Sequence, residues 1–375
     1  MDRLRNIGLI VLMLLSCSKI ILQKNITLYS DAPSWNMYGQ NPARTNFSRD
    51  NIDVPLTLKW RHSASAAIGK TLLVSNGVLF FSTMDGNIHA FSIDSGKKIG
   101  SKKTGFYSTF VLSDSLLFIA RRYGDDTLFR YNLKTGKTDW KLNAGDISSE
   151  PLLFENEIVI TALYKHIDMY KLSNGEKIWK FDTPDHIHSS AASDGDFIIF
   201  GCDDGNIYAL NKSDGKLAWK FKTGAAVQST TAINGGIAFV GSLDRNFYAI
   251  DIKSGELRWQ FLTDGQLFHG AAVTTEMVIF GSTDGWLYNV DQQTGSLNWE
   301  IKTGSVISTS PLVCNDKVFF GTLDRHYYAV DINSGEQIWK YKTRGRVRTA
   351  AIVWNHYLIG ASEDSHVYVF SAEEH

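Results

Sequence analysis

Cysteine is scarce in this chain: 375 residues contain only Cys17, Cys202 and Cys314. None belongs to a Cys-x-x-Cys pair or stands at the His/Cys spacing of a zinc site, so neither a disulfide scaffold nor a structural metal is predicted. An excess of charge is missing too, because 38 basic and 39 acidic residues leave a formal charge of -1. This balance gives no electrostatic reason to expect a nucleic-acid partner.

Familiar catalytic patterns are also missing. The sequence has no Gly-x-Ser-x-Gly elbow, no His-Glu-x-x-His and no P-loop. Aspartates do recur in turns such as "STMDGN", "GSLDRN" and "GSTDGW", each in a separate repeat. Asp and Gly close β-turns through local hydrogen bonds, so these turns are interpreted as structural, and no metal site is predicted from them.

The N-terminus has the layout of a secretory signal. Arg3 and Arg5 precede an apolar run over residues 7–15, which is too short to span a bilayer. The following Leu-Leu-Ser-Cys resembles a bacterial lipobox, which implies cleavage before Cys17 and a lipid on that residue. By the same resemblance, Ser18 favours the outer membrane, with the protein facing the periplasm. An ordinary secretory signal with an incidental cysteine is the alternative. Residues 1–17 are thus expected as signal and 18–34 as a polar tether.

A tryptophan four residues after a glycine recurs about every 40 residues through the rest of the chain. The pairs are Gly136/Trp140, Gly175/Trp179, Gly215/Trp219, Gly255/Trp259, Gly295/Trp299 and Gly335/Trp339. An earlier copy keeps Gly96 but has Gly100 where the ring is expected. Glycine permits the turn, and the indole is expected to pack between neighbouring repeats, with a looser contact at Gly100.

Each repeat reads as four short strands. In residues 225–263, the runs "VQSTTAI", "GIAFVGS", "NFYAID" and "LRWQFLT" are rich in β-branched and aromatic residues and are separated by turn residues. Four antiparallel strands in about 40 residues form a propeller blade. No helical period is sustained after the signal, which excludes a helical solenoid.

The two ends of the repeat region complete one another. Trp60 lies in a strand with no three strands before it, while the last unit stops near Ser371 after three strands. We therefore predict an all-β, eight-bladed propeller over residues 35–371, in which the strand around Trp60 pairs beside residues 367–370. This pairing removes the open edges of a linear array. The framework tryptophans are Trp60, Trp140, Trp179, Trp219, Trp259, Trp299 and Trp339.

The repeat consensus resembles a known family. "YALNKSDGKLAW" and "YAIDIKSGELRW" are similar to the tryptophan-docking repeat of the PQQ-like propellers, and "WNMYGQNPARTNFS" resembles the segment before their first blade. WD40 repeats have a similar period, but their Gly-His and Trp-Asp dipeptides are absent here. The PQQ-like family includes quinoprotein alcohol dehydrogenases and BamB-like outer-membrane assembly lipoproteins.

The resemblance implies two different classes of function. The dehydrogenases hold a quinone with a Ca²⁺ ion and a disulfide between adjacent cysteines, whereas this chain has no adjacent cysteines and only minimal blades. We therefore expect no enzyme activity and no cofactor. The assembly lipoproteins imply a non-catalytic scaffold that binds protein partners, the barrel-assembly machinery among them. The alternative is a propeller that senses or binds a small ligand or carbohydrate at the mouth of its channel.

One face of the propeller carries the candidate binding residues. The innermost strands are expected to begin there with a ring of non-equivalent residues: Gly69, Ser108, Ser148, His188, Gln228, Phe268, Ser308 and Arg348. A repeat needs only a small or β-compatible residue at this place, so the bulky and polar members stand out. With their neighbours, the candidates are Asp185, His186, His188, Gln228, Phe268, His269, Arg325, His326, Arg344, Arg346 and Arg348. The alternative interpretation is a solvated rim with no binding role.

Overall fold

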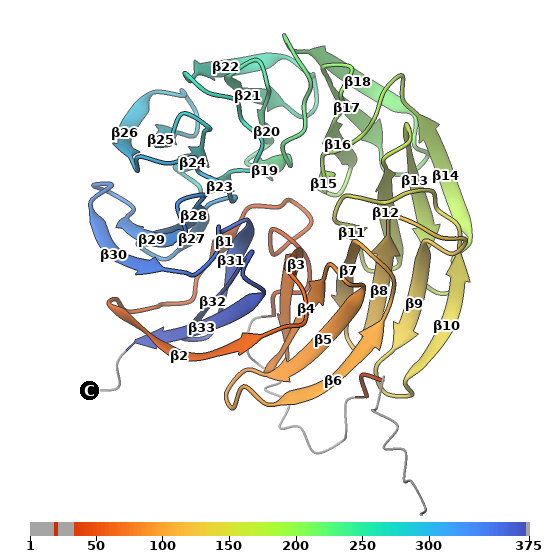
Figure 1. Cartoon of the computed structure of the whole chain (residues 1–375). Coiled ribbons are helices and arrows are strands. Elements are labelled where there is room, and N and C mark those ends of the chain that lie inside the picture. Colours follow the sequence, from red (N-terminus) through yellow and green to blue (C-terminus); the bar gives the residue numbers. More distant parts are fainter. Residues whose placement is uncertain (1–18, 22–33, 373–375) are drawn as a thin grey trace, which may run out of the picture.

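The computed structural model describes residues 19–21 and 34–372, which form an eight-bladed ring of sheets (Figure 1). All of its regular elements are strands, and the described residues contain no helix long and apolar enough to cross a membrane. The predicted all-β propeller is confirmed. Cys17 lies outside the described residues, whereas Cys202 and Cys314 are buried free thiols.

Each blade is an antiparallel sheet whose first strand lies nearest the axis. Blade 1 has β3 (Ile68–Ser75), β4 (Val78–Thr83), β5 (Asn87–Ser92) and β6 (Lys98–Lys103). Blade 2 has β7 (Ser108–Ser113), β8 (Leu116–Arg121), β9 (Leu128–Asn132) and β10 (Lys137–Leu142). Blade 3 has β11 (Leu152–Leu153), β12 (Glu157–Ala162), β13 (His166–Lys171) and β14 (Lys177–Asp182). Blade 4 has β15 (Ala192–Ser193), β16 (Phe197–Gly201), β17 (Asn206–Asn211) and β18 (Leu217–Lys222).

The second half of the ring repeats this order. Blade 5 has β19 (Ala232–Asn234), β20 (Ile237–Gly241), β21 (Asn246–Asp251) and β22 (Leu257–Leu262). Blade 6 has β23 (Ala272–Val273), β24 (Met277–Gly281), β25 (Trp286–Asp291) and β26 (Leu297–Lys302). Blade 7 has β27 (Leu312–Cys314), β28 (Lys317–Thr322), β29 (His326–Asp331) and β30 (Gln337–Lys342). Blade 8 has β31 (Thr349–Trp354), β32 (Tyr357–Ser362), β33 (His366–Ala372) and, from the other end of the chain, β2 (Leu56–Ser63).

The ring closes as the sequence predicts. Strand β2 pairs antiparallel with β33, and Trp60 lies opposite Val369. This pairing satisfies the backbone hydrogen-bonding groups at the outer edge of β33 with a strand from the start of the repeat region. The first and last strands of the propeller therefore hold each other in place.

The segment before β2 crosses the centre of the ring (Figure 1). Its carbonyl groups accept backbone hydrogen bonds from the innermost strands of successive blades, for example from Leu112, Ser193 and Val273. It ends in β1 (Phe47–Ser48), which adds to β27 in parallel as a fifth strand of blade 7. The segment therefore binds the inner strands to one another and occupies part of the axial channel.

The repeat tryptophans connect each blade to the next. In seven of the eight joints an indole N–H donates to a backbone carbonyl of the following blade, as from Trp179 to Lys212 at 2.8 Å. The indole of Trp179 lies so close to Gly215 that a Cβ there would stand 2.6 Å from the ring, and the φ of Gly215 is +69°. This close contact requires glycine at the turn.

The joint between blades 1 and 2, where Gly100 replaces the tryptophan, is filled rather than loose. Lys19–Ile21 lie in the vacant place, inside the range expected as a tether. Ile20 is completely buried, and its carbonyl accepts a 3.1 Å hydrogen bond from the Tyr131 hydroxyl. A Cβ at Gly100 would lie 2.6 Å from the carbonyl oxygen of Lys19. The absence of a side chain at residue 100 thus makes room for another part of the chain.

Candidate functional site

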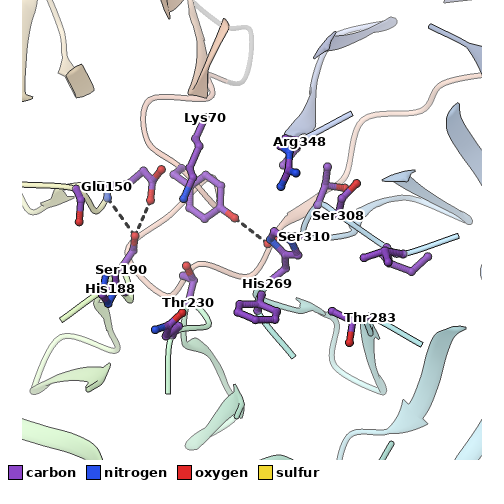
Figure 2. A pocket seen from close by; sticks show the side chains of 18 of the residues that line it. Lys70, Glu150, His188, Ser190, Thr230, His269, Thr283, Ser308, Ser310 and Arg348 are labelled. Atoms are coloured by element: carbon purple, nitrogen blue, oxygen red, sulfur yellow. Dashed lines mark hydrogen bonds between the residues drawn. The ribbon is translucent and has the colours of Figure 1, made fainter. Parts of the chain in front are cut away.

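The predicted ring of residues surrounds a cavity of about 610 Å³ at one end of the axial channel (Figure 2). Six ring members line it: Ser148, His188, Gln228, Phe268, Ser308 and Arg348. Gly69 and Ser108 instead line an adjoining pocket of about 250 Å³, which shares Lys70, Arg122 and Ser148 with the main cavity. The cavity arises because each innermost strand begins at this mouth and turns one side chain towards the axis.

The crossing segment contributes to the cavity wall. Tyr38 lines the cavity and shares a 2.7 Å hydrogen bond with the Ser310 hydroxyl (Figure 2). Burial, reinforced by the Glu150 carboxylate, raises the pKa of Tyr38 to about 12. The phenol is therefore a neutral hydrogen-bonding group at physiological pH.

Arg44 supports this wall from its buried side. Its guanidinium is fully buried and donates to four carbonyl oxygens: Tyr38 at 2.6 Å, Ala191 at 2.9 Å, Glu150 at 2.9 Å and Pro151 at 3.0 Å. Burial lowers the pKa of Arg44 to about 10, with the charge of Glu150 acting in the opposite direction. Arg44 therefore remains a cation beside that carboxyl group.

Glu150 is the acidic group of the cavity. Its side chain is only 7% exposed, and its Oε2 accepts a 2.6 Å hydrogen bond from Ser190. The same hydroxyl accepts the backbone N–H of Glu150 at 3.0 Å, so Ser190 fixes the residue from two sides (Figure 2). The other carboxylate oxygen, Oε1, is buried with no hydrogen-bond partner. A buried acceptor without a partner is rare and costly, which makes this oxygen available to a ligand.

Three cationic side chains face the same space. Arg348 donates to Glu363 at 2.6 Å, whereas Lys70 and Arg122 have no carboxylate partner among the described residues. The Arg122 Nε is buried without a hydrogen-bond partner. Burial lowers the pKa of His269 to about 4, and Lys70 and Arg348 act in the same direction. At neutral pH this imidazole is uncharged, and the cavity has more positive than negative charge.

Three further predicted residues line the cavity: His188 and Gln228 share a polar network, and Phe268 offers an apolar contact. His188 lies 2.8 Å from Asp203, and the Gln228 amide donates to the same carboxylate at 3.0 Å. Asp203 thus joins the rims of blades 4 and 5. Phe268 is 38% exposed and presents an aromatic surface at the mouth.

The other predicted residues lie on the surrounding face. His186 contacts Asp185 at 2.9 Å, and His326 contacts Asp324 at 3.1 Å. Arg346 pairs with Glu363 at 2.7 Å, and this carboxylate also holds Arg348. The expected basic sector of blades 7 and 8 is therefore partly neutralised. Arg325 and Arg344 are exposed beside it.

An aromatic group on the same face escaped the sequence analysis. We call Phe106, Tyr107, Tyr123 and Tyr164 the aromatic loop surface; Phe106 and Tyr164 are 61% and 59% exposed. The rings of Tyr107 and Tyr123 lie 6.1 Å apart, and Tyr164 packs 5.7 Å from His186. For Tyr123 and Tyr164 the signal was present in the irregular turns "ARRYGDDTLF" and "ALYKHIDMY", which depart from the Asp-Gly pattern of the other blades, whereas Phe106 and Tyr107 lie in the loop before β7.

The donor set does not fit a calcium-bound quinone. Ca²⁺ in proteins takes six to eight oxygen ligands, and carboxylates dominate among them. Glu150 is the one carboxylate among the described residues that line the cavity, and it faces three cationic side chains. In the described ranges no group of three or more His, Cys, Asp or Glu residues is arranged to hold a metal ion.

Solved structures resemble the whole propeller. The chain aligns with BamB from Moraxella catarrhalis at a TM-score of 0.71 and 17% identity, covering 84% of this chain and 100% of that one. It aligns with a quinohemoprotein alcohol dehydrogenase from Pseudomonas putida at a TM-score of 0.76 and 13% identity, covering 96% and 84%. At these identities the likeness shows the fold alone.

Sequence comparison is more specific. Outer membrane protein assembly factor BamB from Francisella tularensis is 25% identical over 138 residues, which is 35% of this chain and only 29% of that relative. A family model described as outer membrane protein assembly factor BamB matches residues 57–165. Another, described as the beta-propeller of beta-alanine-activating enzyme, matches residues 147–375. Since this last model matches more than half of the chain, the protein belongs to the family that it describes and is a PQQ-like β-propeller.

Proposed function

We propose that this protein is a non-catalytic scaffold of the bacterial cell envelope that binds a protein partner in outer-membrane protein assembly. The BamB family model over residues 57–165 and the distant BamB relative support this role. The barrel-assembly machinery is the partner that this relationship favours. Among the described residues, the cavity wall holds a single carboxylate, Glu150, beside hydroxyl, amide and cationic groups suited to binding.

The observation that carries the proposal is the aromatic loop surface. Three of its four members are tyrosines, and all four project from loops on the face that carries the cavity mouth. Exposed aromatic groups rimmed by polar residues mark protein interfaces, and tyrosine is among the residues that dominate binding energy. Asp185 and His186 extend this surface on blade 4, since His186 packs against Tyr164. Arg325, Arg344 and Arg346 provide charged groups on blades 7 and 8 of the same face.

A lipid on Cys17 would place the scaffold on the outer membrane, facing the periplasm. Lys19–Ile21 are packed between blades 1 and 2, only two residues after Cys17. Two residues of extended chain span at most about 7 Å. The lipid attachment would therefore be held close to the joint between these two blades.

Site-specific crosslinking in the native envelope tests the scaffold proposal. A photoreactive residue in place of Tyr123 should capture the barrel-assembly protein, because this ring is half-exposed in the aromatic loop surface and lies beside Tyr107. The matched control is Leu297, which is also exposed but lies on the outermost strand β26. It should give no such product.

Two serine substitutions complete the experiment. Tyr107→Ser and Tyr123→Ser together should lower recovery of the partner about tenfold or more, which corresponds to a loss of about 1.4 kcal/mol, less than one hot-spot tyrosine can contribute. Leu297→Ser should leave recovery unchanged. Capture from Leu297 but not from Tyr123, or full recovery with the double variant, would contradict a partner site on this face.

A further inference from the structure

We propose that the axial cavity binds a small anionic sugar, of the hexuronate class, with its acid group towards Lys70 and Arg122 and a ring hydroxyl towards Glu150. This site would be an addition to the scaffold role and does not depend on it. The cavity volume of about 610 Å³ lies within the usual range for small-molecule sites and leaves room for one or two sugar rings.

The charges of the cavity favour an anion. Lys70 and Arg122 face it without a carboxylate partner among the described residues, and Arg122 has a buried Nε with no acceptor. The charge of Glu150 is already balanced from behind by the buried Arg44. A bound carboxylate would satisfy the two unpaired cations, and a planar guanidinium is suited to hold it through two hydrogen bonds.

The polar groups deeper in the cavity favour hydroxyls. Glu150 Oε1 needs a donor, and the nine-tenths-buried carboxyl group is held in place by Ser190. Thr230 and Ser310 also line the cavity (Figure 2), and the Ser310 hydroxyl shares a hydrogen bond with Tyr38. Hydroxyl groups both donate and accept hydrogen bonds, so a polyhydroxylated ring can satisfy the carboxylate and the side-chain hydroxyls at once.

The mouth of the cavity adds an apolar contact. Phe268 is exposed at the rim, and the neighbouring His269 is kept neutral by burial and by Lys70 and Arg348. The C–H face of a sugar ring can pack on such an aromatic surface while its hydroxyls remain hydrogen-bonded. An anion bound next to Lys70 would offset the effect of that cation on His269 and raise the pKa of the imidazole.

Titration calorimetry on the full chain with sodium glucuronate and with glucose tests the proposal. The two sugars differ only in the acid group, so glucuronate should bind about tenfold or more tightly, the equivalent of one charged contact. Lys70→Gln should remove most of this preference, whereas Glu150→Gln should weaken both sugars. The control is Lys220→Gln, an exposed lysine on the outer strand β18. It should change neither.

Any other result would contradict the proposed sugar site. Equal affinity for the two sugars would overturn the role of Lys70 and Arg122, and no binding of either would overturn the site. Tighter binding of β-alanine than of glucuronate would replace the sugar with a zwitterion. Because Lys70 is exposed to the cavity, its variant should fold normally, and NMR titration of His269 with and without glucuronate gives a second readout. None of these results depends on whether a protein partner is captured at Tyr123.

Discussion

Replacing Ile20 with alanine probes the joint between blades 1 and 2, which has no tryptophan. Ile20 is completely buried in the place that an indole occupies at the other joints. Removing buried methyl and methylene groups from such a site costs about 3 kcal/mol, as transfer free energy and cavity formation add together. With an unfolding entropy of about 2.1 cal/mol/K per residue, this loss should lower the midpoint of thermal unfolding by about 4 °C.

The assay is calorimetric or spectroscopic melting of the protein at neutral pH. Ile178→Ala is the matched control, since Ile178 is 39% exposed on the outer strand β14. A surface truncation of this kind should change stability by no more than about 0.5 kcal/mol. Hydrogen exchange gives a second measurement, because loss of the segment should also expose Tyr131, whose hydroxyl donates to the Ile20 carbonyl.

Gly100→Trp provides the converse perturbation. The new side chain cannot share the joint with the Lys19 carbonyl, which would lie 2.6 Å from its Cβ. Exchange protection at Lys19–Ile21 should therefore be lost while the propeller remains folded. An unchanged melting midpoint for Ile20→Ala, together with retained protection in Gly100→Trp, would refute the idea that this segment completes the joint.

Two further perturbations concern charged and titratable groups around the cavity. Arg44→Met should destabilise the protein by about 3 to 5 kcal/mol in urea unfolding, because Glu150 would lose its buried counter-charge and four carbonyls would lose their donor; a loss below 1 kcal/mol would contradict this. The folded-state pKa of His269, about 4, lies below the usual value near 6.5, so the unfolded chain binds a proton first as the pH falls. Stability should therefore be full above about pH 6.5 and decline towards pH 4, and His269→Gln should reduce that decline; an identical decline in the variant would exclude His269 as its source.

The blades were predictable because their determinants are local. Glycine at the turn and tryptophan four residues later recur in phase with the strands, and the incomplete units at both ends imply their own pairing. Ring closure by β2 and β33 followed from counting the strands in the incomplete first and last units. The ring around the channel mouth was also largely predictable, since equivalent positions in a repeat occupy equivalent places. His188, Gln228 and Arg348 accordingly line the cavity.

Only part of the candidate site could be predicted from the sequence. Arg44 lies on the crossing segment and donates to the carbonyl of Glu150, 106 residues further along the chain. Because the crossing segment belongs to no repeat, its contacts cannot be inferred by aligning repeats. Tyr38 and Ser310, 272 residues apart, meet for the same reason. The aromatic loop surface was hidden for another reason. Tyr123 lies in a turn that breaks the repeat, and deviation from a pattern shows where irregularity occurs but not that the ring of Tyr107, from another loop, becomes its neighbour.

The sequence by itself determined the class of fold, the number of blades and the way the ring closes, because β-turns, strand alternation and the docking tryptophan act over one repeat or between adjacent ones. The tertiary structure decided what fills the joint at Gly100 and which polar groups meet in the axial cavity. Those contacts join the N-terminal segment to distant blades. Which residues meet in these contacts depends on shape and on the need to satisfy buried polar groups once the ring has closed.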